Sequence, residues 1–228
     1  MKIRFEPISS VPEETLARNK QLLTRYPEPA RANTTRLAVV GGGPSAEDHL
    51  DEIEQFVDVW AINGAWKWCQ TMGVKATLFT IDPVFTEPAD KAILADICDP
   101  VLAGNCTEVS VVKLDGIARG STSATAVPHI AINLGYREVH FFGCEGSFGE
   151  RTHTFKDIGG SRLLVEVGGM EFLTNPQMLM QCEVLAEMIR MAPHVFISHC
   201  GGLLEAMVAD PDYDCLAGSQ AIHDAMRA

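Results

Sequence analysis

The sequence predicts an α/β protein with a doubly wound, mostly parallel Rossmann-like sheet, helices on both faces and a small β-hairpin insertion. Three observations support this fold class. From residue 36 onward, short apolar runs alternate with longer segments of helical period, and such alternation builds parallel sheets through right-handed crossovers. The apolar runs are continuous, which is typical of strands covered on both faces. The first run ends in a glycine-rich turn at residues 41–45.

The expected elements follow from the position of these runs. We expect strands at 36–41, 57–62, 76–81, 100–103, 110–114, 138–143 and 194–198, and helices at 44–55, 64–72, 88–97, 121–135, 176–191 and 201–208. Apolar residues recur at helical spacing in the two longest helical segments, for example at Val127, Ile130, Ala131 and Leu134. A β-hairpin is expected over 162–174, with Gly168-Gly169 as its turn.

The chain divides into an N-terminal helical extension at 1–35 and a Rossmann-like nucleotide-binding domain at 36–228. In the extension, Ser10 can cap a helix that has Pro12 in its first turn and ends near Arg25, before a proline-rich stop. We expect this helix to pack on the domain or on a second subunit. A homo-oligomer is compatible with the sequence, which does not specify the oligomeric state.

Composition excludes several classes of partner. The formal net charge of −12 argues against nucleic-acid binding, and no apolar run approaches the ~20 residues that cross a membrane. The seven cysteines include no C-x-x-C pair, so we expect a reducing, cytoplasmic location. An acidic protein that binds a nucleotide needs local compensation from backbone N–H groups, arginines or a divalent cation.

The glycine-rich turn predicts a phosphate site. Gly41, Gly42 and Gly43 let a ligand approach the backbone, and Pro44-Ser45 opens a helix whose N-terminus favours negative charge. The spacing also fits the dinucleotide fingerprint, which requires an acidic residue at the end of the second strand. That strand ends in Asn63. We therefore expect a nucleotide site, with Asn63 contacting the nucleotide, rather than a nicotinamide site.

Further polar residues follow other expected strands, and ligands bind beyond the carboxyl ends of parallel strands. Asp82, followed by Pro83, can bind Mg²⁺ on phosphates, or it can form an Asx turn or a helix cap. Gly143 ends the strand at 138–143 and is a further candidate nucleotide contact, and Glu145, two residues later, is the second candidate metal ligand or base. His199 either lines the cleft or ends its strand.

Two loops add candidates. Gly120-Ser121-Thr122-Ser123 opens a helix and can form a second anion contact, while N-capping by Ser121 or Thr122 explains the same residues. The loop at 143–153 has the character of a lid. In it, His153 can act as a general base or bind phosphate, or it can simply be exposed. Cys144 is expected to be packed rather than nucleophilic.

The motifs occur in the order of a known family. The order resembles the MptE-like 6-hydroxymethylpterin diphosphokinase family, related to flagellin-associated glycosyltransferases, and the resemblance covers roughly 36–208. Its motifs are Gly41-Gly-Gly-Pro-Ser45, Ala61-Ile-Asn63, Ile81-Asp-Pro83, Gly120-Ser-Thr-Ser-Ala124, Gly143-Cys-Glu145, Thr152-His153, Phe172-Leu-Thr174 and Ser198-His-Cys-Gly-Gly202. Glu145 stands where that family typically has Asp.

The resemblance implies an Mg²⁺-dependent transferase that passes a diphosphoryl group from ATP to a hydroxymethylpterin-like acceptor. Asp82 and Glu145 would hold Mg²⁺, the glycine turn and residues 121–123 would hold phosphates, and His153 would activate the acceptor. The partners implied are a nucleotide and a small-molecule acceptor.

The same order also resembles the bacterial sialyltransferases that use CMP-sugars, although those enzymes usually carry Asn where this chain has Gly42. A CMP-sugar glycosyltransferase is therefore the alternative function. A nucleotide-binding module without turnover is the third.

Overall fold

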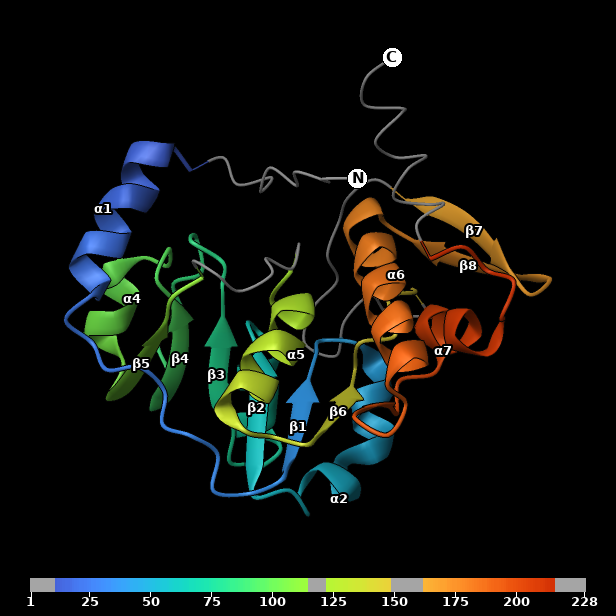
Figure 1. Cartoon of the computed structure of the whole chain (residues 1–228), viewed down its shortest axis with the longest axis horizontal. Coiled ribbons are helices and arrows are strands. Elements are labelled where there is room, and N and C mark those ends of the chain that lie inside the picture. The colour runs from blue at the N-terminus through green and yellow to red at the C-terminus, as the bar shows by residue number, and fades with distance from the viewer. Residues whose placement is uncertain (1–10, 115–121, 149–161, 216–228) are drawn as a thin grey trace.

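The computed structural model describes residues 11–114, 122–148 and 162–215 of the chain. Seven strands form one sheet in the order β5-β4-β3-β2-β1-β6-β9 (Figure 1), and every pair is parallel. The strands are β1 (Arg36–Val40), β2 (Asp58–Ile62), β3 (Thr77–Thr80), β4 (Lys91–Ala95), β5 (Glu108–Val112), β6 (Glu138–Phe142) and β9 (Phe196–Ser198). The predicted fold class is confirmed.

Helices cover both faces of the sheet. In Figure 1, α5 and α6 lie on the viewer's side, and their contact with each other links the centre of the sheet to its β9 edge. The helices are α1 (Glu13–Leu23), the 3-10 helix η1 (Pro44–His49), α2 (Leu50–Ile53), α3 (Ala65–Thr71), α4 (Pro100–Asn105), α5 (Ser123–Leu134), α6 (Pro176–Met191) and α7 (Gly202–Ala209). Within the described residues, no helix has the length and apolar character needed to cross a membrane.

The strand order places a topological switch point between β1 and β6. From β1 the chain adds β2, β3, β4 and β5 on one side, and then returns to add β6 and β9 on the other. At such a point the connections leave two neighbouring strands in opposite directions, which opens a crevice at their carboxyl ends. The turn at 41–45 follows β1 and the segment at 143–147 follows β6, so both candidate loops meet there.

The expectations for residues 88–103 are wrong. The predicted helix at 88–97 contains strand β4, and the predicted strand at 100–103 lies in helix α4. Ala92, Leu94 and their neighbours favour helices intrinsically, but β3 and β5 pair with this run on both sides and bury four of its five residues. Asp99 then caps α4 by accepting a hydrogen bond from the Val101 N–H at 2.8 Å, with Pro100 in the first turn.

The single helix predicted at 44–55 is also corrected. Pro44 begins the 3-10 helix η1, which gives way at His49 to the short α2. The glycine turn therefore leads into a tight 3-10 turn rather than into a regular α-helix. The predicted strand at 110–114 begins two residues earlier, at Glu108.

The N-terminal helix and the hairpin form as predicted. Helix α1 packs on α4, and the Asn19 side chain donates to the carbonyl of Ile97 at 3.1 Å, so α1 lies on the domain. Ser10, its predicted cap, lies outside the described residues. The antiparallel hairpin comprises β7 (Leu163–Val167) and β8 (Met170–Thr174). Gly168 and Gly169 both have positive φ, as its two-residue turn requires.

Candidate functional site

The glycine turn packs directly against the end of β6. The Gly41 N–H donates to the carbonyl of Phe142 at 2.7 Å, and the Gly43 N–H donates to the carbonyl of Gly143 at 2.8 Å. A Cβ on Gly41 would collide with the Gly143 carbonyl oxygen. The chain itself therefore needs glycine at position 41, because backbone approaches backbone here.

The carboxylate of Glu145 sits in the turn. One oxygen accepts the Ser45 N–H at 2.9 Å, and the other accepts the Ser45 hydroxyl at 2.8 Å. A Cβ on Gly43 would collide with this carboxylate. Burial raises the pKa of Glu145, and the hydrogen bonds from Ser45 act in the opposite direction. The Ser45 N–H and hydroxyl, which could bind an anionic oxygen of a ligand, thus already bind the side chain of Glu145.

A cavity of about 370 Å³ opens beside this contact. Three carboxyl residues line it, namely Glu47, Asp48 and Glu145, together with Pro44, Ser45 and residues of the facing loops. Among the described residues that line it, none is Lys or Arg. Carboxylate and hydroxyl oxygens are the ligands that Mg²⁺ accepts, so the residue types suit a divalent cation, and their charge would repel a bare polyphosphate. Among the described residues, these three carboxyl groups are not gathered at metal-ligand spacing, so binding an ion requires their side chains to move together.

A second group of predicted residues meets farther along the same edge. Asn63 follows β2 with a left-handed φ of 48°. The Ser123 hydroxyl lies 3.4 Å from the Asn63 side-chain oxygen and accepts the Ile81 N–H at 3.2 Å. The segments that follow β2 and β3 thus both contact Ser123, at the start of α5. Thr122 caps that helix by accepting from the Thr125 N–H, as the capping alternative predicts.

Asp82 follows β3, and its side chain forms an Asx turn. One carboxylate oxygen accepts the Val84 N–H at 3.0 Å. Strands β2 and β1 separate β3 from β6, which corresponds to about 14 Å between backbones. Ligation of one ion by both Asp82 and Glu145 stays a prediction, and it requires their side chains to approach each other across two strand ends.

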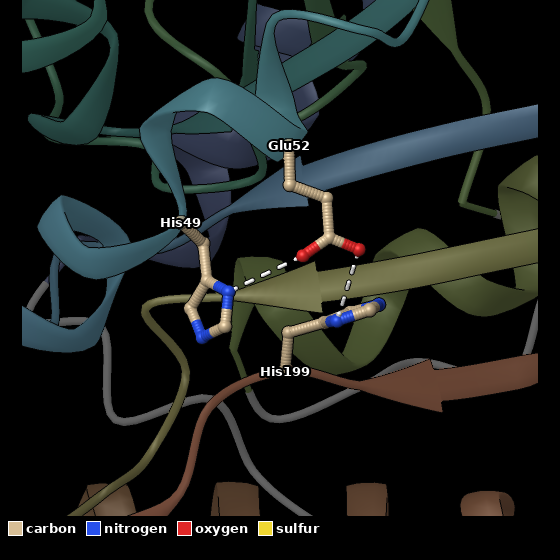
Figure 2. Close-up of side chains that lie close together, drawn as sticks. All are labelled: His49, Glu52 and His199. Atoms are coloured by element: carbon tan, nitrogen blue, oxygen red, sulfur yellow. Dashed lines mark hydrogen bonds and ion pairs between the residues drawn. The ribbon is translucent and has the colours of Figure 1, made fainter.

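His199 follows β9 and lies on the face of the sheet that carries η1 and α2. Its ring stacks on Phe142, with centroids 4.5 Å apart. It also contacts Glu52, His140 and His49, as Figure 2 shows for His49 and Glu52. Burial lowers the pKa of both His140 and His199. The sequence interpretation missed the other members, although the spacing His49-x-x-Glu52 was a usable signal.

Three predicted site residues, Gly120, Ser121 and His153, lie outside the described residues. Of the remaining ones, Gly42 lies in the turn between its two packed neighbours, and Gly143 has a φ of 64° where it touches that turn. Cys144 is buried as predicted, and the neighbouring Cys200 thiol together with burial holds the pKa of Cys144 well above its ordinary value.

Another cavity, of about 400 Å³, lies between α6 and the segment that follows α7. It is not at the strand ends. Arg190 lines it and donates to the carbonyl groups of Met207, Asp210 and Tyr213, which fastens the segment after α7 to α6. We attribute this cavity to packing.

The fold and the site together define a doubly wound α/β protein with an acidic cavity at its switch point. In comparisons with known proteins, no family model, no curated protein and no solved structure matches the chain.

Proposed function

We propose that the protein is an Mg²⁺-dependent transferase that passes a diphosphoryl group from ATP to a hydroxymethylpterin-like acceptor in the cytoplasm. The observation that carries the proposal is the carboxylate-lined cavity at the glycine turn, between β1 and β6. Ligands of open α/β sheets bind at this kind of position. The motif order that resembles the MptE-like family supplies the class of reaction.

Glu145 and Asp48 would hold Mg²⁺ in the cavity. The described lining residues include no Lys or Arg. A bound Mg²⁺ would supply the positive charge that neutralises the phosphates. Because the Ser45 N–H and hydroxyl now donate to Glu145, rotation of that carboxylate toward the ion would leave both donors for a phosphate oxygen. The turn would thus exchange its own carboxylate for the anion of the substrate.

The second group of residues would hold the rest of the substrates. Asn63 and Ser123 would contact the nucleoside, Asp82 would serve as a further metal ligand, and His153 would activate the acceptor hydroxyl. Diphosphoryl transfer needs in-line positioning and charge neutralisation more than covalent participation by the protein. These residues would position the nucleotide and the acceptor relative to each other.

A CMP-sugar glycosyltransferase is the second candidate. The contact between Asn63 and Ser123 supports it, because it joins two motifs, an Asn-ending strand and a Gly-x-x-Ser helix start, that the sequence shares with the sialyltransferases that it resembles. Such an enzyme would bind CMP in preference to ATP.

Calorimetric titration with ATP, AMP and CMP, with and without Mg²⁺, tests the proposal. We expect ATP to bind only with Mg²⁺, and 6-hydroxymethyl-dihydropterin to be diphosphorylated with release of AMP. Preference for CMP would support the glycosyltransferase instead, and binding without turnover would leave a binding module. Either result overturns the diphosphokinase assignment.

Two isosteric variants locate the ion. Glu145→Gln is expected to weaken Mg²⁺-dependent ATP binding by about tenfold or more, since a charge-assisted contact is lost. Asp82→Asn keeps an oxygen for the Val84 N–H, so the fold should be intact while metal-assisted binding is lost. Glu54→Gln, an exposed residue beyond α2, is the control. A variant whose Mg²⁺ dependence is unchanged removes that residue from the mechanism.

A further inference from the structure

Two histidines and a glutamate meet on the face of the sheet that carries η1 and α2 (Figure 2). His49 ends η1, Glu52 lies in α2, and His199 follows β9. The Nδ1 atoms of His49 and His199 lie 3.2 and 3.3 Å from the two carboxylate oxygens of Glu52. One donor atom from each residue can be chosen so that all three lie within 4.8 Å of one another.

The donor set is that of a zinc site. Two imidazole nitrogens and one carboxylate oxygen form a common set of three protein ligands for catalytic Zn²⁺. Zn²⁺ bonds of 2.0–2.1 Å at tetrahedral angles hold neighbouring ligand atoms about 3.3 Å apart. The two nitrogen–oxygen distances here are close to that value but end on different oxygens of Glu52, so ligation of one ion requires a small rotation of these side chains. The side chains of His49, Glu52 and His199 are 35%, 39% and 19% exposed, which leaves a solvent side for a fourth ligand.

The rings are held in place by aromatic packing. Phe142 stacks on His199 with an interplanar angle of 12°, and its centroid lies 5.8 Å from that of His49. Phe56 packs edge-on against His140 behind them. A site whose ligands are oriented before the ion arrives loses less conformational freedom on binding.

A hydrogen-bond chain continues from the cluster behind His199. His199 Nε2 lies 3.0 Å from His140 Nδ1, and His140 Nε2 lies 3.4 Å from the carboxylate of Glu138, which also pairs with Arg36. The carboxylates at the two ends, Glu52 and Glu138, only accept hydrogen bonds. The chain has three contacts, but two neutral imidazoles carry only two N–H groups. If both N–H groups point to the carboxylates, His199 Nε2 and His140 Nδ1 face each other without a proton between them.

Either a third proton on the histidine pair or a cation bound to His199 Nδ1 removes this conflict. With Nδ1 bound to the ion, the His199 proton resides on Nε2 and is donated to His140, whose own N–H is donated to Glu138. Metal-bound histidines typically direct their second N–H toward a carboxylate or carbonyl, and here His140 would relay that contact to the Glu138 carboxylate.

We propose that His49, Glu52 and His199 bind one Zn²⁺ ion, with His140 and Glu138 as positioning residues and a solvent-facing fourth position. These three ligands are not among the residues that line the carboxylate-lined cavity, although Asp48 and Cys200, next to His49 and His199 in the sequence, do line it. The zinc site does not depend on the proposed nucleotide activity. Zn²⁺ is preferred to Mg²⁺ because imidazole nitrogen suits borderline transition metals, while Mg²⁺ selects oxygen.

Titration of the metal-free full-length chain with Zn²⁺, in competition with a chromophoric chelator, tests the site. We expect one equivalent to bind tightly, and no competition from millimolar Mg²⁺. Co²⁺ in place of Zn²⁺ should give the visible bands of a tetrahedral nitrogen–oxygen site without thiolate charge transfer. Absence of saturable binding, or a thiolate band that assigns the metal to cysteines, would overturn the proposal.

Matched variants assign the ligands. Glu52→Gln and His49→Gln should each weaken Zn²⁺ binding by more than the 10–100-fold typical of an outer-shell change, and Glu138→Gln should weaken it within that range. The exposed controls Glu54→Gln and His194→Gln should bind like the wild type. Equal affinity in all five variants would refute the site.

One measurement on the wild-type chain does not depend on variants that fold. Long-range ¹⁵N–¹H spectra should show that one equivalent of Zn²⁺ moves the ring Nδ1 resonances of His49 and His199, and places the His199 proton on Nε2. Shifts confined to other histidines would contradict the assignment.

Discussion

Gly41 and Gly43 illustrate, at the scale of single residues, how one pattern can serve two purposes. Both glycines fit the spacing of a phosphate-binding turn, and both are also required by contacts within the chain. The Gly143 carbonyl lies against the first, and the Glu145 carboxylate lies against the second. The sequence alone predicted the turn but not these contacts, because 100 residues separate Ser45 from Glu145.

The contact between Gly43 and Glu145 can be tested by a double-mutant cycle. Gly43 has a φ of −74°, so alanine fits its backbone and only the added Cβ meets the carboxylate. We expect Gly43→Ala to lower the free energy of unfolding by about 1–3 kcal/mol through overpacking. Glu145→Ala in the same chain should recover part of that loss. Urea unfolding of the two single variants and the double variant measures the coupling.

Gly41→Ala provides the matched control for this cycle. Its Cβ would meet the Gly143 carbonyl and the Cys144 thiol, and not the Glu145 carboxylate, so Glu145→Ala should give no recovery. If the changes at positions 43 and 145 add without coupling, the carboxylate does not occupy the turn in solution.

The histidine cluster shows a different limit of sequence reasoning. His49 and Glu52 are three residues apart in the sequence, but His199 joins them only through the pairing of β9 with β6. Side chains from distant segments meet where the sheet order brings them, and single-sequence patterns do not specify that order.

At the scale of elements, the strongest sequence signals were periodicity and turn chemistry. The helices α5 and α6 and the β7–β8 hairpin form where apolar spacing and the glycine pair predict them. The segment around β4 was misread because its alanines and leucine favour a helix, while pairing with two neighbours makes it a strand. The Asp99-Pro100 pair favours the start of a helix, and the apolar residues that follow it lie in α4 rather than in a strand.

Asp99 therefore has a measurable role as a helix cap. Asp99→Ala is expected to lower the free energy of unfolding by about 1 kcal/mol, because the Val101 N–H loses its acceptor. Asp99→Asn keeps an acceptor and should cost less. Chemical unfolding measures the difference, with Asp90→Ala at an exposed position before β4 as the control. Equal stability of Asp99→Ala and the wild type would mean that the cap contributes nothing to α4.

At the scale of the whole molecule, the strand order explains why the candidate residues gather. Seven parallel strands direct their carboxyl ends to one edge, so polar residues that follow different strands share that edge. The sequence predicted this convergence in general terms. It did not predict that the sheet would divide the residues into one group at the β1–β6 switch point and another around Ser123, since that requires the order of the strands.

The overall negative charge is consistent with the cation dependence proposed for the site. The chain has a formal net charge of −12, and three carboxyl residues line the cavity at the switch point. A polyphosphate approaching without a cation meets repulsion there. The proposed function therefore depends on a metal–nucleotide complex rather than on the free nucleotide.

A crystal structure of the full chain with Mn²⁺ and ATP, the ion located by its anomalous scattering, tests this central claim most directly. The account predicts a nucleotide-dependent Mn²⁺ peak in the cavity beside Glu145, with that carboxylate turned away from Ser45 and a phosphate oxygen on the Ser45 N–H. A nucleotide bound elsewhere, or Glu145 still on Ser45 at saturating Mn²⁺ and ATP, would contradict it.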